Sequence, residues 1–86
     1  MNGVIDNPDH TLRLNVVEEL LQGLEGEKPI AETLVSAEKL FIEDVSDKLI
    51  IKAKQRVGTL NQRYSQGEMK DEEVKVEISN ILLMLT

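Results

Sequence analysis

The sequence predicts an all-α protein, a small antiparallel helical bundle of four helices, from three observations. Apolar residues recur at spacings of three and four, the period of an amphipathic helix and not of a strand. Glycine or proline interrupts the pattern between the expected helices. Aromatic residues are limited to one phenylalanine and one tyrosine, a composition typical of helical bundles. Because 86 residues suffice for one core, we expect a flexible leader over residues 1–8 and a single domain over residues 9–86.

The first helix is predicted over about residues 9–24. Asn7 supplies an N-cap and Pro8 a favourable first helical residue, with Asp9 and Thr11 as alternative caps. The apolar face of this helix is expected to consist of Leu12, Val16, Val17, Leu20, Leu21 and Leu24. The intervening polar residues then lie outside.

Gly23 and Gly26 are expected to end the first helix, and Pro29 to lie in the first turn of a second helix over about residues 29–44. The core face predicted for the second helix is Ile30, Leu34, Ala37 and Phe41. Phe41 is the bulkiest apolar side chain of the sequence, so we expect it near the centre of the bundle.

The third helix is predicted over about residues 46–66, with Ser46 as its N-cap and Asp47 in its first turn. Its core face is expected to be Leu49, Ala53, Val57, Leu60 and Tyr64. Gly58 lowers the helix propensity at an interior position, which indicates a close approach of a neighbouring helix or a small distortion. Gly67 is expected to end the helix in the left-handed conformation.

The fourth helix is predicted over about residues 71–85, capped by Asp71 and with Glu72 and Glu73 in its first turn. Its core face is expected to be Val74, Ile78, Ile81 and Leu85. Four apolar residues of the last two helices do not fit the core faces: Ile51, Val76, Leu83 and Met84. Either the fourth helix is buried on several sides, or it offers an apolar patch to another chain.

Charge is distributed unevenly along the chain, whose formal net charge is −6. Residues 1–46 carry ten acidic and three basic side chains, residues 47–70 carry two and six, and residues 71–86 carry four and one. Phosphate binding requires a broad basic face, whereas the basic segment here is flanked by acidic ones. The pattern therefore argues against a nucleic-acid partner and favours another protein.

Side chains that usually carry catalysis or hold metals are scarce. The chain has no cysteine, and its one histidine, His10, lies at a helix start where a surface position is expected. The acidic residues Glu72, Glu73 and Glu77 lack the Glu-x-x-His pairing of di-iron bundles, so capping and solvation explain them. We therefore expect a protein that is not an enzyme and needs no cofactor or metal. The absence of cysteine suits a reducing cytoplasm, where we expect this protein. No apolar run approaches the roughly 20 residues of a membrane span, so we expect no membrane partner.

The last two predicted helices carry a family resemblance. Arg56-x-x-x-Leu60, then Gly67, Glu72-Glu73 and an Ile/Leu-rich terminal helix resemble the effector-associated domains of bacterial conflict systems. The resemblance covers about residues 49–85. Two segments depart from the family pattern: Val57-Gly58 stands in place of Tyr-Asn, and Ser79-Asn80-Ile81 in place of Asn-Arg-Ile. They lack polar and aromatic signature residues of the family.

This resemblance implies a death-fold-like helical adaptor domain that functions in bacterial immunity. The resemblance implies no catalytic residues and no cofactors. Such domains associate with related domains on proteases, TIR proteins or NTPase sensors, or with themselves. From the charge pattern we expect acidic and basic faces of different copies to meet. The candidate interaction residues are Lys48, Lys52, Lys54, Arg56, Arg63, Glu18, Glu19, Glu38, Leu83 and Met84. A rival hypothesis is a small obligate homodimeric bundle with a structural or regulatory, antitoxin-like role.

Overall fold

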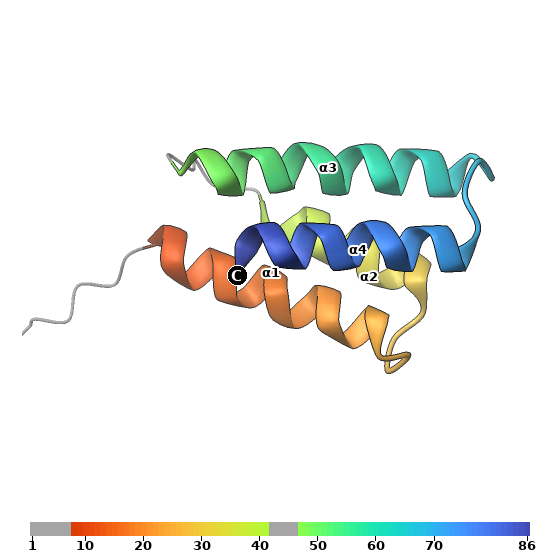
Figure 1. Ribbon diagram of the computed structural model, residues 1–86, viewed down its shortest axis with the longest axis horizontal. Helices are drawn as coiled ribbons and strands as arrows, with labels where there is room; N and C mark the ends of the chain where they lie inside the picture. Colours follow the sequence, from red (N-terminus) through yellow and green to blue (C-terminus); the bar gives the residue numbers. More distant parts are fainter. Residues whose placement is uncertain (1–7, 42–46) are drawn as a thin grey trace, which may run out of the picture.

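The computed structural model describes residues 8–41 and 47–86 (Figure 1). These residues form α1 (Pro8–Leu24), α2 (Ile30–Leu40), α3 (Lys48–Ser65) and α4 (Asp71–Leu85), and no strand occurs among them. Consecutive helices run antiparallel, and α4 closes the bundle by packing against both α1 and α3. The predicted all-α fold class, a small bundle of four helices, is confirmed.

All four helices contribute to one apolar core, whose burial is the main favourable contribution to folding. The core faces predicted for the second and fourth helices are buried completely. In α1, Val16 and Leu20 are fully buried, whereas Leu21 is exposed, contrary to the prediction. The buried apolar residues are Val16, Leu20, Ile30, Leu34, Ala37, Phe41, Ile50, Ala53, Val57, Leu60, Val74, Ile78, Ile81, Leu82 and Leu85.

The register of α3 differs from the prediction at its first turn. Leu49, predicted to lie in the core, is 52% exposed, and its neighbour Ile50 is only 2% exposed. Both residues satisfy helical spacing to Ala53, at four and three residues respectively. Packing against the neighbouring helices selects Ile50.

Glycine ends two of the helices through left-handed backbone conformations. Gly26 has φ +82°, and the Glu27 N–H donates to the Gln22 carbonyl at 2.9 Å while the Gly26 N–H donates to the Gly23 carbonyl at 3.2 Å. This pair of bonds satisfies carbonyls that the helix leaves without partners. Gly67, at φ +77°, ends α3 with the same pattern, as predicted.

A close approach of a neighbouring helix, one of the two alternatives expected at Gly58, occurs instead at Gly23. A Cβ atom on Gly23 would lie 2.8 Å from the Thr33 Cβ, closer than side chains tolerate, so this glycine allows α1 and α2 to pack. At Gly58 the nearest atom to such a Cβ is Glu38 Oε2 at 3.6 Å, an ordinary van der Waals distance. Gly23 lies within α1, which continues to Leu24, so the prediction that Gly23 ends the helix is wrong.

The starts of α1, α2 and α3 differ from the predicted ranges by one or two residues, whereas α4 begins at Asp71 as predicted. Pro8 is the first residue of α1, as predicted, while its predicted cap Asn7 lies outside the described residues. Pro29 has extended backbone angles and precedes α2, which begins at Ile30. The Asp47 carboxylate accepts hydrogen bonds from the N–H groups of the second and third residues of α3, at 2.8 and 3.3 Å. Asp47 is therefore the N-cap and not a first-turn residue. Ser46, predicted as the cap, lies outside the described residues.

Two further helix boundaries correct the predictions. α2 ends at Leu40, because Phe41 leaves the helical region at ψ 38° and donates its N–H to the Glu38 carbonyl three residues back. The remainder of the predicted helix, residues 42–44, lies outside the described residues. In α4, Lys70 occupies the N-cap position predicted for Asp71, and the Glu73 carboxylate accepts its N–H at 3.0 Å.

Candidate protein-interaction surface

The basic residues predicted to form an interaction surface are concentrated on α3. This helix carries five basic residues, no acidic one, and all five side chains are exposed. At about 100° per residue, four of them share one side of the helix. These four, Lys48, Lys52, Arg56 and Arg63, are called the basic ridge below.

The fifth basic residue of α3, Lys54, faces a different neighbour. It precedes Asn61 by seven residues and so shares its face of the helix. The Asn61 side-chain amide donates to Glu38 Oε1 of α2 at 2.6 Å, which identifies that face as the one toward α2. Lys54 is thus separated from the basic ridge, contrary to the grouping predicted from the sequence.

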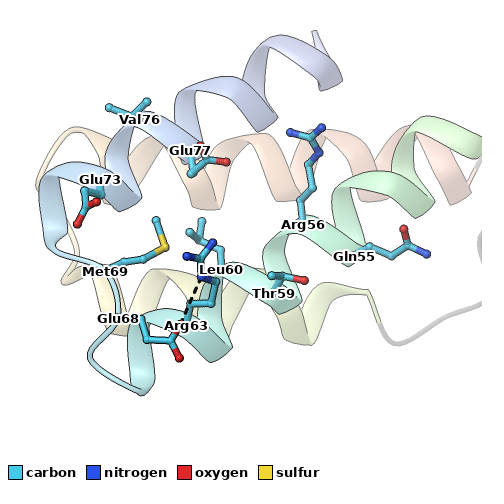
Figure 2. Close-up of a pocket in the computed structure, with 10 residues that line it drawn as sticks. All are labelled: Gln55, Arg56, Thr59, Leu60, Arg63, Glu68, Met69, Glu73, Val76 and Glu77. Carbon is cyan, nitrogen blue, oxygen red and sulfur yellow. Dashed lines mark ion pairs between the residues drawn. The ribbon is translucent and has the colours of Figure 1, made fainter.

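A groove of about 630 Å³ lies between α3 and α4, next to the turn that connects them (Figure 2). Arg56 and Arg63 enter it from α3, and Glu73 and Glu77 from α4. Residues that the sequence did not single out, including Met69 in the turn, complete its wall. The full lining is Gln55, Arg56, Thr59, Leu60, Arg63, Glu68, Met69, Glu73, Val76 and Glu77.

The two arginines of the groove differ in their partners. Arg63 Nε lies 3.6 Å from Glu68 Oε1, and both side chains are more than half exposed, so this ion pair contributes little to stability. Arg56 forms no ion pair with any residue of the described ranges. Its guanidinium is therefore available for a carboxylate from outside the chain.

The outer side of α4 exposes two large aliphatic side chains. Val76 is 59% exposed and Leu83 is 76% exposed, and their separation of seven residues places them on one face, opposite the core. Figure 2 shows Val76 projecting from the outer side of α4. Ile51 is exposed as well, whereas Met84 is partly buried against the core. Burial therefore accounts for Met84 alone among the four apolar residues that did not fit the predicted faces.

The predicted acidic candidates have unequal roles. Glu18 is exposed on α1. Glu19 is partly buried and forms an ion pair with Lys28, with 2.7 Å between Lys28 Nζ and Glu19 Oε1, which braces the turn between α1 and α2. Glu38 accepts the hydrogen bond from Asn61 and so connects α2 to α3. Of the three, Glu18 is the carboxylate that the fold leaves available.

A ridge on α1 was missed by the sequence analysis. Leu14, Glu18, Leu21 and Glu25 follow one another at spacings of four, three and four, and all four are exposed. They are called the α1 ridge below. A helical repeat of leucine and glutamate on the side away from Val16 and Leu20 was the signal available in the sequence.

A tyrosine at the end of α3 is tied to the start of α4. The Tyr64 hydroxyl donates to Asp71 Oδ1 at 2.6 Å, across the turn that contains Gly67. This hydrogen bond, together with desolvation and the Asp71 charge, raises the pKa of Tyr64 above its ordinary value of 10.0. Tyr64 thus fixes the geometry of the turn beside the groove.

Other kinds of site receive no positive support. Within residues 8–41 and 47–86, no cluster of three or more histidine, cysteine, aspartate or glutamate side chains is arranged to hold a metal ion. None of the four helices in these ranges combines the length and the hydropathy needed to cross a membrane. His10 is exposed, as expected of a surface histidine, and its Nδ1 atom lies 3.1 Å from Arg13 Nη2.

Comparisons of the chain with models of known protein families, with curated proteins and with solved structures find no match. The resemblance to effector-associated domains therefore stays a prediction from the sequence.

Proposed function

We propose that this chain is a non-catalytic adaptor domain that binds other helical domains, or a second copy of itself, through the side of the bundle formed by α3 and α4. The observation that carries this proposal is the exposure of Val76 and Leu83 on a helix whose opposite face builds the core. An exposed apolar patch rimmed by polar residues is typical of a surface that binds another protein. Arg56, without an ion-pair partner among the described residues, adds a charge that can fix orientation.

The biological setting that we propose rests on the family resemblance. An adaptor of this kind would connect a sensor to an effector such as a protease, a TIR protein or an NTPase of a bacterial conflict system, in the cytoplasm. An acidic domain with one basic helix suits such recruitment, because complementary surfaces accelerate encounter and exclude wrong partners.

The alternative function, an obligate homodimer with a structural or regulatory role, is favoured by one feature of α4. Ser79 and Asn80 lie midway between Val76 and Leu83. If two α4 helices met antiparallel about a two-fold axis between Ser79 and Asn80, Val76 of one copy would contact Leu83 of the other. Such a contact closes on itself and gives one fixed mass.

Light scattering across a concentration series tests the proposed function. Leu83→Asp should reduce association, because it places a charge at an exposed apolar contact, and should leave helicity unchanged. Val35→Asp is the matched control, since Val35 is also an exposed aliphatic residue but lies on α2. Equal association of the two variants would contradict a role for the α4 face. A fixed dimer mass at every concentration would favour the obligate homodimer.

A further inference from the structure

We propose that the groove between α3 and α4 binds the α1 ridge of a second copy of this chain, so that copies associate head to tail. This inference rests on the proposed function and names the two surfaces and the partner. The α1 ridge consists of Leu14, Glu18, Leu21 and Glu25, all exposed. The receiving surface combines Arg56, Arg63 and Val76, which line the groove, with Leu83, which lies outside the groove lining but on the same outer face of α4 as Val76.

The spacing of charges and apolar groups matches between the two surfaces. Glu18 and Glu25 are seven residues apart, and so are Arg56 and Arg63. Both pairs therefore span about 10.5 Å along their helices, at about 1.5 Å per residue. An α1 helix lying along α3 can place both glutamates against both arginines at once.

The apolar groups fit the same arrangement. Leu21 lies between Glu18 and Glu25 on the α1 ridge, and Val76 and Leu83 are seven residues apart on α4. Because α3 and α4 run antiparallel side by side, Arg63 lies toward the end of the groove that holds Val76. A ridge whose glutamates contact α3 therefore places Leu21 between the two aliphatic side chains of α4. The result is a small apolar centre with a charged rim.

The charges inside the groove determine how the docking helix is rotated about its own axis. Glu73 and Glu77 line its α4 wall and repel carboxylates, so the glutamates of an incoming helix are directed toward α3. The Glu73 carboxylate is already engaged by the Lys70 N–H. On the α3 side, Arg56 lacks an ion-pair partner in the described part of the chain, and Arg63 can exchange its exposed partner Glu68 at small cost.

The α1 ridge that matches the groove must come from a second copy, because the chain's own α1 cannot reach the groove. α1 packs between α2 and α4, and the α1 ridge lies on the side of that helix away from its buried residues Val16 and Leu20. The groove lies beyond α4, between α4 and α3. Two different surfaces of one molecule are thus complementary, which produces a heterologous contact that repeats from copy to copy.

Charge exchange between two variants tests this contact. The groove variant is Arg56→Glu with Arg63→Glu, and the ridge variant is Glu18→Arg with Glu25→Arg. Each should associate more weakly than the unmodified chain by a factor on the order of 10 to 100, because attractive pairs become repulsive. Mixed in equal amounts, the two variants should regain association, since the reversed charges complement one another.

The matched control is Lys39→Glu with Lys54→Glu, which alters net charge by the same amount at exposed positions outside the groove. It should retain association, and circular dichroism should show equal helicity for all variants. Normal association of the groove variant, or no recovery on mixing, would overturn the inference. If Leu83→Asp still abolished association in that case, the proposed function would stand and only the docking surfaces would be wrong. An unmodified chain that is monomeric at every concentration would overturn both self-association and this contact.

Discussion

Two glycines in helices, Gly23 and Gly58, are predicted to respond in opposite ways to the same substitution. Gly23→Ala forces a methyl group against the buried side chain of Thr33, and overpacking of this kind costs about 1–3 kcal/mol. The higher helix propensity of alanine recovers only about 0.5–1 kcal/mol. Gly58→Ala makes only an ordinary van der Waals contact, with Glu38 Oε2 at 3.6 Å, so it should raise the free energy of unfolding by about 0.5–1 kcal/mol.

Urea unfolding of both variants measures this difference. Thr33→Ala, introduced together with Gly23→Ala, should relieve part of the overpacking, so the double mutant should be more stable than the sum of the single changes predicts. Stabilisation by Gly23→Ala alone would show that α1 and α2 do not pack as closely as described.

Titration of Tyr64 provides a second test at the level of a single residue. Because its pKa is raised in the folded state, the hydrogen bond to Asp71 stabilises the protein below the unfolded pKa of about 10, and this contribution is lost as pH rises through the folded value. Tyr64 is the one tyrosine of a chain without tryptophan, so ultraviolet absorbance reports its ionisation alone.

The midpoint of that titration should move down toward 10 in the Asp71→Ala variant, which removes both the acceptor and the charge. Asp71→Asn retains an acceptor and should give an intermediate midpoint. An identical midpoint in all three proteins would show that the hydrogen bond is absent in solution.

Some buried residues could not be predicted from the sequence. The run Leu49-Ile50-Ile51 offers three apolar side chains about 100° apart, and helical spacing alone cannot choose which one enters the core. Burial of Thr33 is equally invisible in an apolar pattern. Its hydroxyl donates to the Pro29 carbonyl four residues back at 2.9 Å, which satisfies the polar group inside the bundle.

Among the helices, α3 depends most clearly on a cap. Asp47→Ala removes the carboxylate that accepts the N–H groups of the second and third residues of α3, and should lower the free energy of unfolding by about 1 kcal/mol. Thermal unfolding measures the loss. Asp47→Ser is the control, because serine caps a helix as well, and equal destabilisation by alanine and serine would indicate that capping is not the cause.

Helix ends were predictable where the backbone requires a particular residue and uncertain elsewhere. Gly26 and Gly67 adopt positive φ angles that other residues rarely reach, so they mark true ends. Gly23 has no positive φ angle and contacts Thr33, which is ten residues away in sequence. No local feature of the sequence distinguishes it from a glycine that ends a helix. The end of α2 at Leu40 likewise has no adjacent glycine or proline from which it could be predicted.

Over the whole molecule, the sequence identified part of the charged and apolar residues of the proposed contact, but not their arrangement. The basic residues of α3 and Leu83 were recognisable as exposed from residue type and spacing. The groove was not, because it depends on how α3 and α4 pack side by side, and on Met69 and Glu68 in the turn between them. The separation of Lys54 from the ridge follows from which face of α3 meets α2.

A contact between unlike surfaces has a consequence for the size of the assembly. Each copy can give its α1 ridge to one neighbour and receive another in its groove, so copies extend into an open chain or close into a circle. The groove variant described above retains its α1 ridge and loses its groove. When added in small amount to the unmodified chain, it should bind at one end of an assembly and prevent further addition there.

The mean mass measured by light scattering should therefore fall steeply as the fraction of the groove variant rises, and the ridge variant should act likewise from the opposite end. Raising the salt concentration from about 0.1 M to about 1 M shortens the electrostatic screening length from about 10 Å to about 3 Å, so the unmodified assembly should also become smaller. A two-fold contact through α4 predicts neither effect, because the arginines and glutamates exchanged in these variants lie outside its proposed centre between Ser79 and Asn80. A mass that is insensitive to both variants and to salt would thus favour the closed dimer over the head-to-tail assembly.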